Sequence, residues 1–302
     1  FAVGAESERA GVKLHAGMSL RSHAVVRPRI SAQEVSDERG IDLGRSLEDV
    51  LVLLDRGYSA HKLFASVGDQ GGFYLTRLKT STNPVVGAVH EGRRAKTSAR
   101  GMTLDDALAE GVLPMDRVVD MSVELSLGDK APLPARVVGV PVVDDDGDTK
   151  VWWYLTNLPR AGYPPTMLRE LYRLRWQVEL LWKQLKGRFR LDDIEAMTER
   201  NVRLVMESAI LAHFLSLGVL DAVTTATERK KLTVGRMALA FPFAIGKLAK
   251  MMTTDDEDEA LALARKLRRG ILQAASDTNP KRTRLAKERR RKKLSRSKKA
   301  GS

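Results

Sequence analysis

The 302-residue sequence contains no cysteine. This absence excludes a disulfide scaffold, a thiolate zinc site and a cysteine nucleophile, and it suits a protein of the reducing cytoplasm. No apolar run reaches about 18 residues, so we expect no membrane span. The apolar run at 209–220 is interrupted by His213 and Ser216 and predicts a core helix. The N-terminus, which begins with Phe1, also lacks the pattern of a signal peptide.

The positive charge is concentrated at one end of the chain. The formal net charge is +13. Residues 281–302 contain twelve Lys or Arg and one acid, Glu288, for a net +11, so the other 280 residues carry only +2. A segment of this kind binds polyanions through counterion release, and it is equally typical of a solubilising, disordered end.

The segment 12–82 has the strand and helix order of an α/β core. Its apolar or alternating runs predict strands at 12–20, 24–30, 50–54 and 73–78, and Ser59 is a suitable N-cap for a helix over 59–67. The run 50–54 is wholly apolar, as in strands buried on both faces, and it ends at Asp55. Sites in α/β sheets lie at the carboxyl ends of strands, which makes Asp55 a candidate; a turn-forming role is the alternative.

The rest of the chain changes from strands to helices. From about 83 to 160 the pattern predicts strands, most clearly at 118–127, 135–143 and 150–155, with a hairpin turn at 144–147. After Pro164 and Pro165 it predicts helices at 166–188, 201–222, 229–252 and 255–275. The acidic cluster at 255–259 is best explained by the dipole of the last helix, not by a metal site.

One predicted helix combines an apolar stripe with a second stripe of polar and charged residues. At about 100° per residue, one face of 166–188 collects five apolar residues: Leu171, Leu174, Val178, Leu181 and Leu185. A second stripe contains four polar residues: Tyr172, Arg175, Glu179 and Lys186. A carboxylate can bind a hard cation, and Arg and Lys beside it can bind phosphate. The pattern also fits an ordinary amphipathic helix with a solvated charged face.

The polar stripe resembles the Y-x2-R-x3-E-x6-K signature of the insertion-sequence-four family of DDE transposases. All three spacings match, and four fixed residues would match by chance in roughly one of several hundred chains of this length. Neighbouring phrases also look like this family: Gly11-Val12-Lys13-Leu14-His15, Leu54-Asp55-Arg56-Gly57-Tyr58, the segment 72–79 and Thr156-Asn157-Leu158-Pro159. The resemblance covers about residues 10–220.

The resemblance implies an α/β fold. Its core is a ribonuclease-H-like mixed sheet with helices, interrupted by a β-rich insertion and followed by a helical C-terminal region. The expected division is a first core part at 1–82, the insertion at 83–160, the rest of the core with the signature helix at 161–222, a helical region at 223–280 and a basic disordered tail at 281–302.

The resemblance also implies phosphoryl transfer on DNA. Asp55 and Glu179 would be the catalytic, metal-binding carboxylates for Mg²⁺ or Mn²⁺. Tyr172, Arg175 and Lys186 would hold the phosphate of a transposon end, and Trp152 would stack on a base flipped from that end. The five histidines are scattered and show no metal-ligand spacing.

The chain departs from the family at the first catalytic aspartate. That residue precedes the Lys-Leu-His phrase in the family, whereas the first aspartate here is Asp37. We expect an N-terminally truncated or degenerate copy that binds DNA and cleaves it poorly.

The implied partners are double-stranded DNA, as transposon ends and target, and a second copy of the chain on paired ends, with no membrane. The expected location is the bacterial cytoplasm, at the nucleoid. Two alternatives remain open: a ribonuclease-H-like nuclease without a transposition role, and a non-catalytic nucleic-acid-binding protein that acts through its basic tail.

Overall fold

The computed structural model describes residues 12–32, 34–36, 40–41, 43–44, 46–92, 99–143, 147–189, 198–223, 244–251 and 253–275. The chain forms two compact units, Phe1–Leu181 and Trp182–Ser302. The predictions for the basic tail and for most of the helix at 229–252 lie outside the described residues, although residues 244–251 are helical.

The first unit begins with a separate hairpin. Strands β1 (Val12–Met18) and β2 (Val25–Ala32) pair antiparallel in a two-stranded sheet. Both strands were predicted, but they make no ladder with the larger sheet in the described part of the chain. The core strands predicted at 12–20 and 24–30 therefore lie outside the larger sheet.

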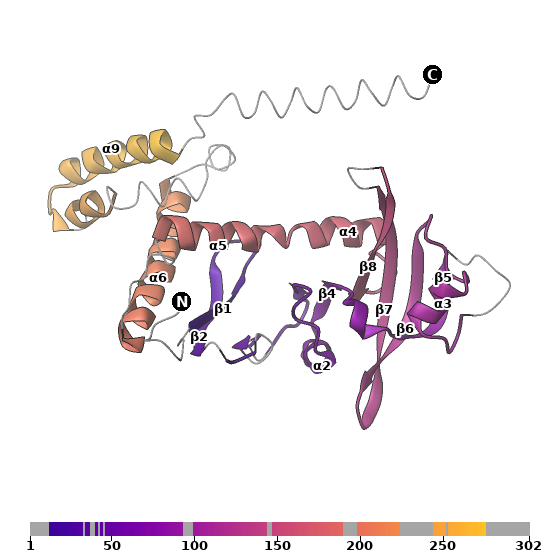
Figure 1. Cartoon of the computed structure of the whole chain (residues 1–302). Helices are drawn as coiled ribbons and strands as arrows, with labels where there is room; N and C mark the ends of the chain where they lie inside the picture. Colours follow the sequence, from indigo (N-terminus) through magenta and orange to yellow (C-terminus); the bar gives the residue numbers. More distant parts are fainter. Residues whose placement is uncertain are drawn as a thin grey trace, which may run out of the picture. The chain divides into compact units, whose positions relative to one another are not determined.

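The larger sheet of the first unit has six strands in the order β3-β4-β8-β7-β6-β5 (Figure 1). The strands are β3 (Leu51–Leu53), β4 (Phe73–Arg77), β5 (Val85–Glu91), β6 (Val119–Leu127), β7 (Lys130–Val143) and β8 (Thr149–Thr156). The pair β3–β4 is parallel and the other pairs are antiparallel, so the sheet is mixed. Because β8 pairs with β4, the strands of 83–160 extend the same sheet as β3 and β4.

Each face of this sheet is covered by helices. Helix α2 (His61–Asp69) packs on β4 and β6, and Phe64 and Val67 join Tyr74 in a cluster that also includes residues of α3 (Leu104–Ala109). Helix α4 (Pro165–Arg173) packs on β4 and β7, and its Leu168 joins Leu75 in a second cluster. Helix α2 begins after Ala60 without a side-chain cap, so the predicted Ser59 cap is wrong.

The long helix predicted at 166–188 is two helices. Helix α4 ends at Arg173 and α5 (Trp176–Phe189) follows. At the junction, backbone N–H groups bond three residues back, from Leu174 to Leu171 and from Arg175 to Tyr172. This tighter turn breaks the uniform helical period, so Leu174, predicted in the core, is 43% exposed, whereas Tyr172 is 8% exposed.

The second unit contains α6 (Glu199–Val223) and α9 (Glu257–Ala275), close to the predicted bounds. Acidic residues fill the first turn of α9, as predicted from the helix dipole. Asp256 also caps the helix, because it accepts hydrogen bonds from the backbone N–H groups of Asp258 and Glu259. Lys250 pairs with Glu259 at 2.7 Å and lowers the pKa of that carboxyl.

Helix α6 has an unexpected distribution of polarity. Ala209 and Leu217 are buried as predicted, but so are His213 and Ser216, while Leu211 and Phe214 are exposed. Its stretch Glu199–Val219 has the length and mean hydropathy, 1.5, of a membrane-spanning helix. Core helices of soluble proteins meet the same two criteria, so this finding by itself does not distinguish the two.

Candidate active site

Asp55 lies just beyond the carboxyl end of β3, where the sequence predicted it. Leu51 and Leu53 belong to the cluster under α4, and Leu54 belongs to the opposite cluster. Because side chains alternate along an extended chain, the next residue returns to the α4 side of the sheet. The Asp55 carboxylate accepts the backbone N–H of Arg56 at 2.5 Å, which orients it at the start of the turn.

Arg175 joins Asp55 to Glu179. Its Nη1 donates to Oδ2 of Asp55 at 3.0 Å, and its Nη2 donates to Oε1 of Glu179 at 2.6 Å. The first contact crosses from the helix junction to the sheet, and the second follows α5 by one turn. The side chain of Arg175 is 18% exposed, that of Glu179 34% and that of Asp55 57%, so the group is open to solvent on the Asp55 side.

The electrostatics of this group favour a bound cation. Burial lowers the pKa of Arg175, but the hydrogen bond to Glu179 and the charge of Asp55 outweigh it, and the net pKa lies above its usual value. Two carboxylates thus share one guanidinium charge. Carboxylate oxygens are the ligands that Mg²⁺ and Mn²⁺ prefer, so the donor atoms fit a divalent ion. Among the described residues no group of three or more His, Cys, Asp or Glu has metal-binding geometry.

Tyr172 forms the floor beside this group. Its ring packs edge-on to Tyr154, with centroids 5.6 Å apart, and the Arg175 guanidinium carbon lies 5.7 Å from its centroid. Burial raises the pKa of the Tyr172 hydroxyl, while the charge of Arg175 acts in the opposite direction. The buried Tyr172 ring therefore packs beside the Arg175 guanidinium, which contacts the two acids.

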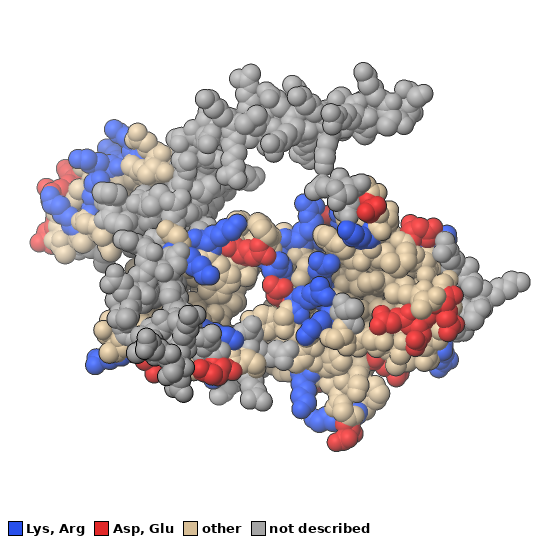
Figure 2. Space-filling model, in the orientation of Figure 1, with Lys and Arg blue, Asp and Glu red and all other residues tan. Residues whose placement is uncertain are grey.

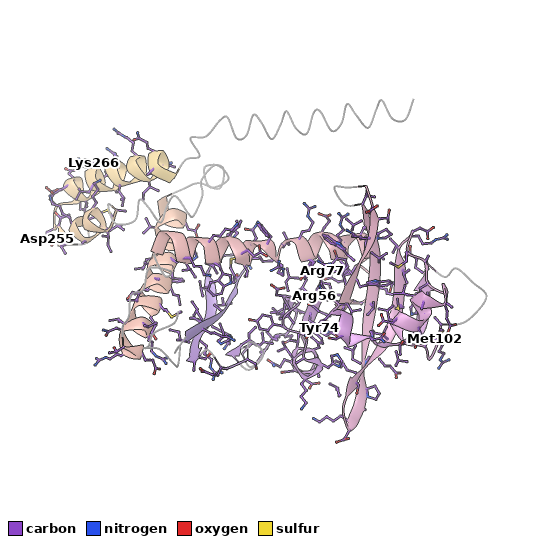
Figure 3. All side chains as sticks on the ribbon, in the orientation of Figure 1. Arg56, Tyr74, Arg77, Met102, Asp255 and Lys266 are labelled. Atoms are coloured by element: carbon purple, nitrogen blue, oxygen red, sulfur yellow. The ribbon has the colours of Figure 1, made fainter. Side chains whose placement is uncertain are left out.

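Trp152 lies with Tyr154 on the α4 face of β8. Trp153 lies on the other face. The guanidinium carbon of Arg77 lies 4.6 Å from the centroid of the Trp152 ring, a cation–π contact. Figure 3 shows Arg77 on the α4 side of β4 and Tyr74 toward α2.

Arg77 is a candidate that the sequence analysis did not single out. Burial raises the pKa of the Tyr154 hydroxyl, and the charges of Arg77 and Arg169 act in the opposite direction, so both cations lie near the Tyr154 and Tyr172 rings. In Figure 2, basic side chains gather over α4 and β4 in the middle of the view. The signal available in the sequence was its place at the end of the strand 73–77, inside a phrase already matched to the family.

The structure thus brings five of the six candidates into the first unit: Asp55, Trp152, Tyr172, Arg175 and Glu179. Direct contacts join Asp55, Arg175, Glu179 and Tyr172. Lys186 is exposed on the part of α5 that belongs to the second unit.

Comparison with known proteins finds similarity to transposases. A family model described as "Transposase DDE domain" matches residues 3–215. "Putative transposase y4zB" of Sinorhizobium fredii is 26% identical over 210 residues, which cover 68% of this chain and 52% of that protein. The transposase for insertion sequence element IS231F of Bacillus thuringiensis is 32% identical over 78 residues, 26% of this chain and 16% of that protein.

A third relative is the transposase for insertion sequence element IS421 of Escherichia coli. It is 38% identical over 61 residues, which cover 20% of this chain and 16% of that protein. The chain spans about half the length of y4zB, the relative with the longest match of these three.

Proposed function

We propose, from the premise that this chain belongs to the DDE transposase domain family, that it acts on the DNA ends of an insertion sequence by metal-dependent phosphoryl transfer. The observation that carries the proposal is the contact of one guanidinium, that of Arg175, with both Asp55 and Glu179. These acids are distant in sequence and are the two that the family resemblance assigns to catalysis. The mixed sheet and its parallel pair β3–β4 support a ribonuclease-H-like core.

Asp55 and Glu179 would hold the divalent ion, Mg²⁺ or Mn²⁺. When bound, such an ion activates a water or a 3′-hydroxyl and stabilises the leaving oxygen. Residues of the chain itself would compensate charge and bind the DNA phosphate. Arg175 offsets one of the two negative charges, and with an ion bound to the acids its donors would be available to a DNA phosphate, which guanidinium groups bind well. The Tyr172 ring packs beside that guanidinium and keeps it next to the acids. Lys186 would add positive charge for binding the phosphate backbone of DNA.

We further propose that Trp152 stacks on a base extruded from the DNA end. In the structure the guanidinium of Arg77 lies over the Trp152 ring, and a stacked nucleobase would displace that guanidinium. The released guanidinium is then free to bind the adjacent phosphate. Aromatic stacking on an unpaired base contributes roughly 1–3 kcal/mol, enough to stabilise an extruded nucleotide.

This chain is proposed to bind the DNA on which it acts at the site formed by Asp55, Arg175 and Glu179. We propose that its substrate is double-stranded DNA and that it acts as a homodimer on paired ends. The proposed location is the bacterial cytoplasm, at the nucleoid.

The test compares the full chain with Glu179→Gln. The assays are binding of duplex DNA, Mn²⁺ binding, and nicking of end-bearing DNA in Mn²⁺. Glu179→Gln should lower Mn²⁺ affinity and remove residual nicking while DNA binding persists, because the amide keeps the shape and loses the charge. Glu170→Gln on α4 is the matched control, since that exposed acid forms an ion pair with Arg173 on the same helix.

Two outcomes would replace the proposal. Efficient cleavage of unrelated DNA, without preference for insertion-sequence ends, indicates a nuclease without a transposition role. Mn²⁺ binding unchanged by Glu179→Gln, together with DNA binding that depends wholly on residues 281–302, indicates a non-catalytic protein acting through its basic tail.

A further inference from the structure

The connection between β8 and α4 is held by side chains that have no place in the site described above. At the end of β8, Thr156 Oγ1 donates to the carbonyl of Tyr74 at 2.5 Å and accepts the N–H of Leu158 at 3.0 Å. The Asn157 carboxamide accepts the N–H of Tyr74 at 2.8 Å and donates to the carbonyl of Gly72 at 2.9 Å. Two consecutive side chains thus bond to the backbone leading into and along β4.

Asn157 takes the place of a ladder partner. The last β4–β8 pair is Leu75 with Thr156, so an antiparallel continuation would put Asn157 opposite Tyr74. The chain leaves the sheet there, and the carboxamide supplies one acceptor and one donor to β4 as a backbone would. On its other edge Tyr74 pairs with Val52 of β3. Asn157 is therefore one strand away from the chain that ends in Asp55.

Arg136 holds the other end of the connection. Its Nε lies 3.1 Å from both carboxylate oxygens of Asp120, and its Nη2 lies 2.6 Å from Oδ2. Its Nη1 donates to the carbonyl of Tyr163 at 2.9 Å and lies 3.4 Å from that of Pro159. Both charged side chains are 5% exposed. A buried guanidinium held by a carboxylate has one orientation, and it fixes the turn that precedes α4.

We propose that Asn157 and Arg136 are positioning residues, which together set the place of Arg175 and Glu179 relative to Asp55. Asn157 ties the connection to the β3–β4 pair that ends in Asp55, and Arg136 ties it to β6 and β7. Helix α4 starts at Pro165, directly after the clamped turn, and leads to the junction that carries Arg175. The consequence for metal binding rests on the proposed function of the Asp55 and Glu179 site, whereas the positional role does not.

The absence of cysteine makes the geometry measurable in the full chain. Spin labels on Lys62→Cys in α2 and Glu170→Cys in α4 report the separation of the two helices on either side of β4. The test variants are Asn157→Ala, Asn157→Asp and Arg136→Lys. Asn157→Asp keeps the acceptor for the N–H of Tyr74 and loses the donor to the carbonyl of Gly72. Arg136→Lys keeps the positive charge and loses the two-donor geometry of the guanidinium. Asn83→Ala is the matched control, because that carboxamide also accepts a backbone N–H, from Asp105 at 2.9 Å.

We expect the distance between the two spin labels to shift or broaden in all three variants and to stay unchanged in the control. The measurement is made under conditions where circular dichroism shows each chain folded. Mn²⁺ affinity should fall roughly tenfold, as for other outer-shell partners of metal ligands. An unchanged distance in folded Asn157→Ala and Asn157→Asp overturns the proposal, as does an equal change in Asn83→Ala. If the parent chain binds no Mn²⁺, the proposed function fails, and the label distance alone decides the positional role.

Discussion

The guanidinium of Arg175 donates a 3.0 Å hydrogen bond to Asp55, a residue 120 positions earlier in the chain. The same group donates to Glu179 at 2.6 Å. One side chain at a helix junction thus links the sheet to α5 and offsets one of the two negative charges. Arg175 therefore competes with any cation for those carboxylates.

Removing that competitor should separate metal binding from DNA binding. In Arg175→Ala, Mn²⁺ affinity should rise about fivefold, because partly exposed ion pairs are worth about 1 kcal/mol. Duplex DNA affinity should fall roughly tenfold, the equivalent of one charge-assisted hydrogen bond to phosphate. Isothermal titration with Mn²⁺ and fluorescence anisotropy with DNA measure the two effects.

The control for this variant is Arg173→Ala. Arg173 lies on α4 and, among the described residues, forms an ion pair with exposed Glu170. Its loss should leave Mn²⁺ affinity unchanged. A fall in Mn²⁺ affinity in Arg175→Ala would show that the guanidinium organises the acids instead of competing for them.

Alkaline pH should destabilise the first unit through Tyr154. Its hydroxyl is buried without a hydrogen-bond partner among the described residues, and burial raises its pKa to about 12 despite the charges of Arg77 and Arg169. The native state thus favours the neutral form, so this contribution to stability is complete below the usual pKa of 10 and is lost as the pH rises through about 12.

Tyr154→Phe tests this assignment. The variant should resist unfolding between about pH 10 and 12 better than the parent, and at neutral pH it should be as stable or slightly more stable, because an unpaired buried hydroxyl is removed. Urea unfolding followed at a series of pH values measures both effects. Identical pH profiles for parent and variant would contradict the assignment.

Gly139 should tolerate no side chain. It pairs directly with Trp153 in the β7–β8 ladder, and a Cβ at this position would lie 2.5 Å from the indole ring. Gly139→Ala should lower the free energy of unfolding by roughly 1–3 kcal/mol, as overpacking does. Chemical denaturation with tryptophan fluorescence measures the change.

Gly218 in α6 provides the contrasting case. A Cβ there meets nothing within 4 Å, so Gly218→Ala should stabilise the helix by about 0.5–1 kcal/mol. Equal effects of the two substitutions would show that backbone entropy, not the Trp153 ring, governs position 139.

The salt dependence of DNA binding should follow the C-terminal charge. Residues 281–302 carry a net +11 against +2 for the remainder, so their deletion should flatten the slope of log affinity against log salt concentration. A chain in which the twelve Lys and Arg of this segment are replaced by Gln is the control for length. An unchanged slope in both chains would place the phosphate contacts in the folded units.

The sequence predicted local structure well where the periodic signal was strong. Apolar and alternating runs located β3, β4, β6 and β8 to within about two residues, because strands buried on a sheet require that pattern. The family signature was identified from four spaced residues, and the family match covers residues 3–215.

The break between α4 and α5 was not predictable from the same pattern. Leu171, Leu174 and Val178 fit one helical stripe, yet Leu174 is exposed. The junction depends on contacts made by Tyr172 with the sheet and by Arg175 with Asp55, which are non-local. Local propensity contains no information about those contacts.

The sequence alone therefore determined the chemistry that is present: a tyrosine, an arginine, a glutamate and a lysine in family spacing, an aspartate after an apolar strand, and a basic segment at one end. Only the tertiary structure decided how they meet. The parallel pairing of β3 and β4 places Asp55, the carboxamide of Asn157 and the guanidinium of Arg136 anchor the connection to α4, and the tight turn after α4 presents Arg175. The physical reason is that spacing along a chain specifies side chains and periodicity, whereas the meeting of residues 120 positions apart depends on packing and hydrogen bonds that form only in the folded molecule.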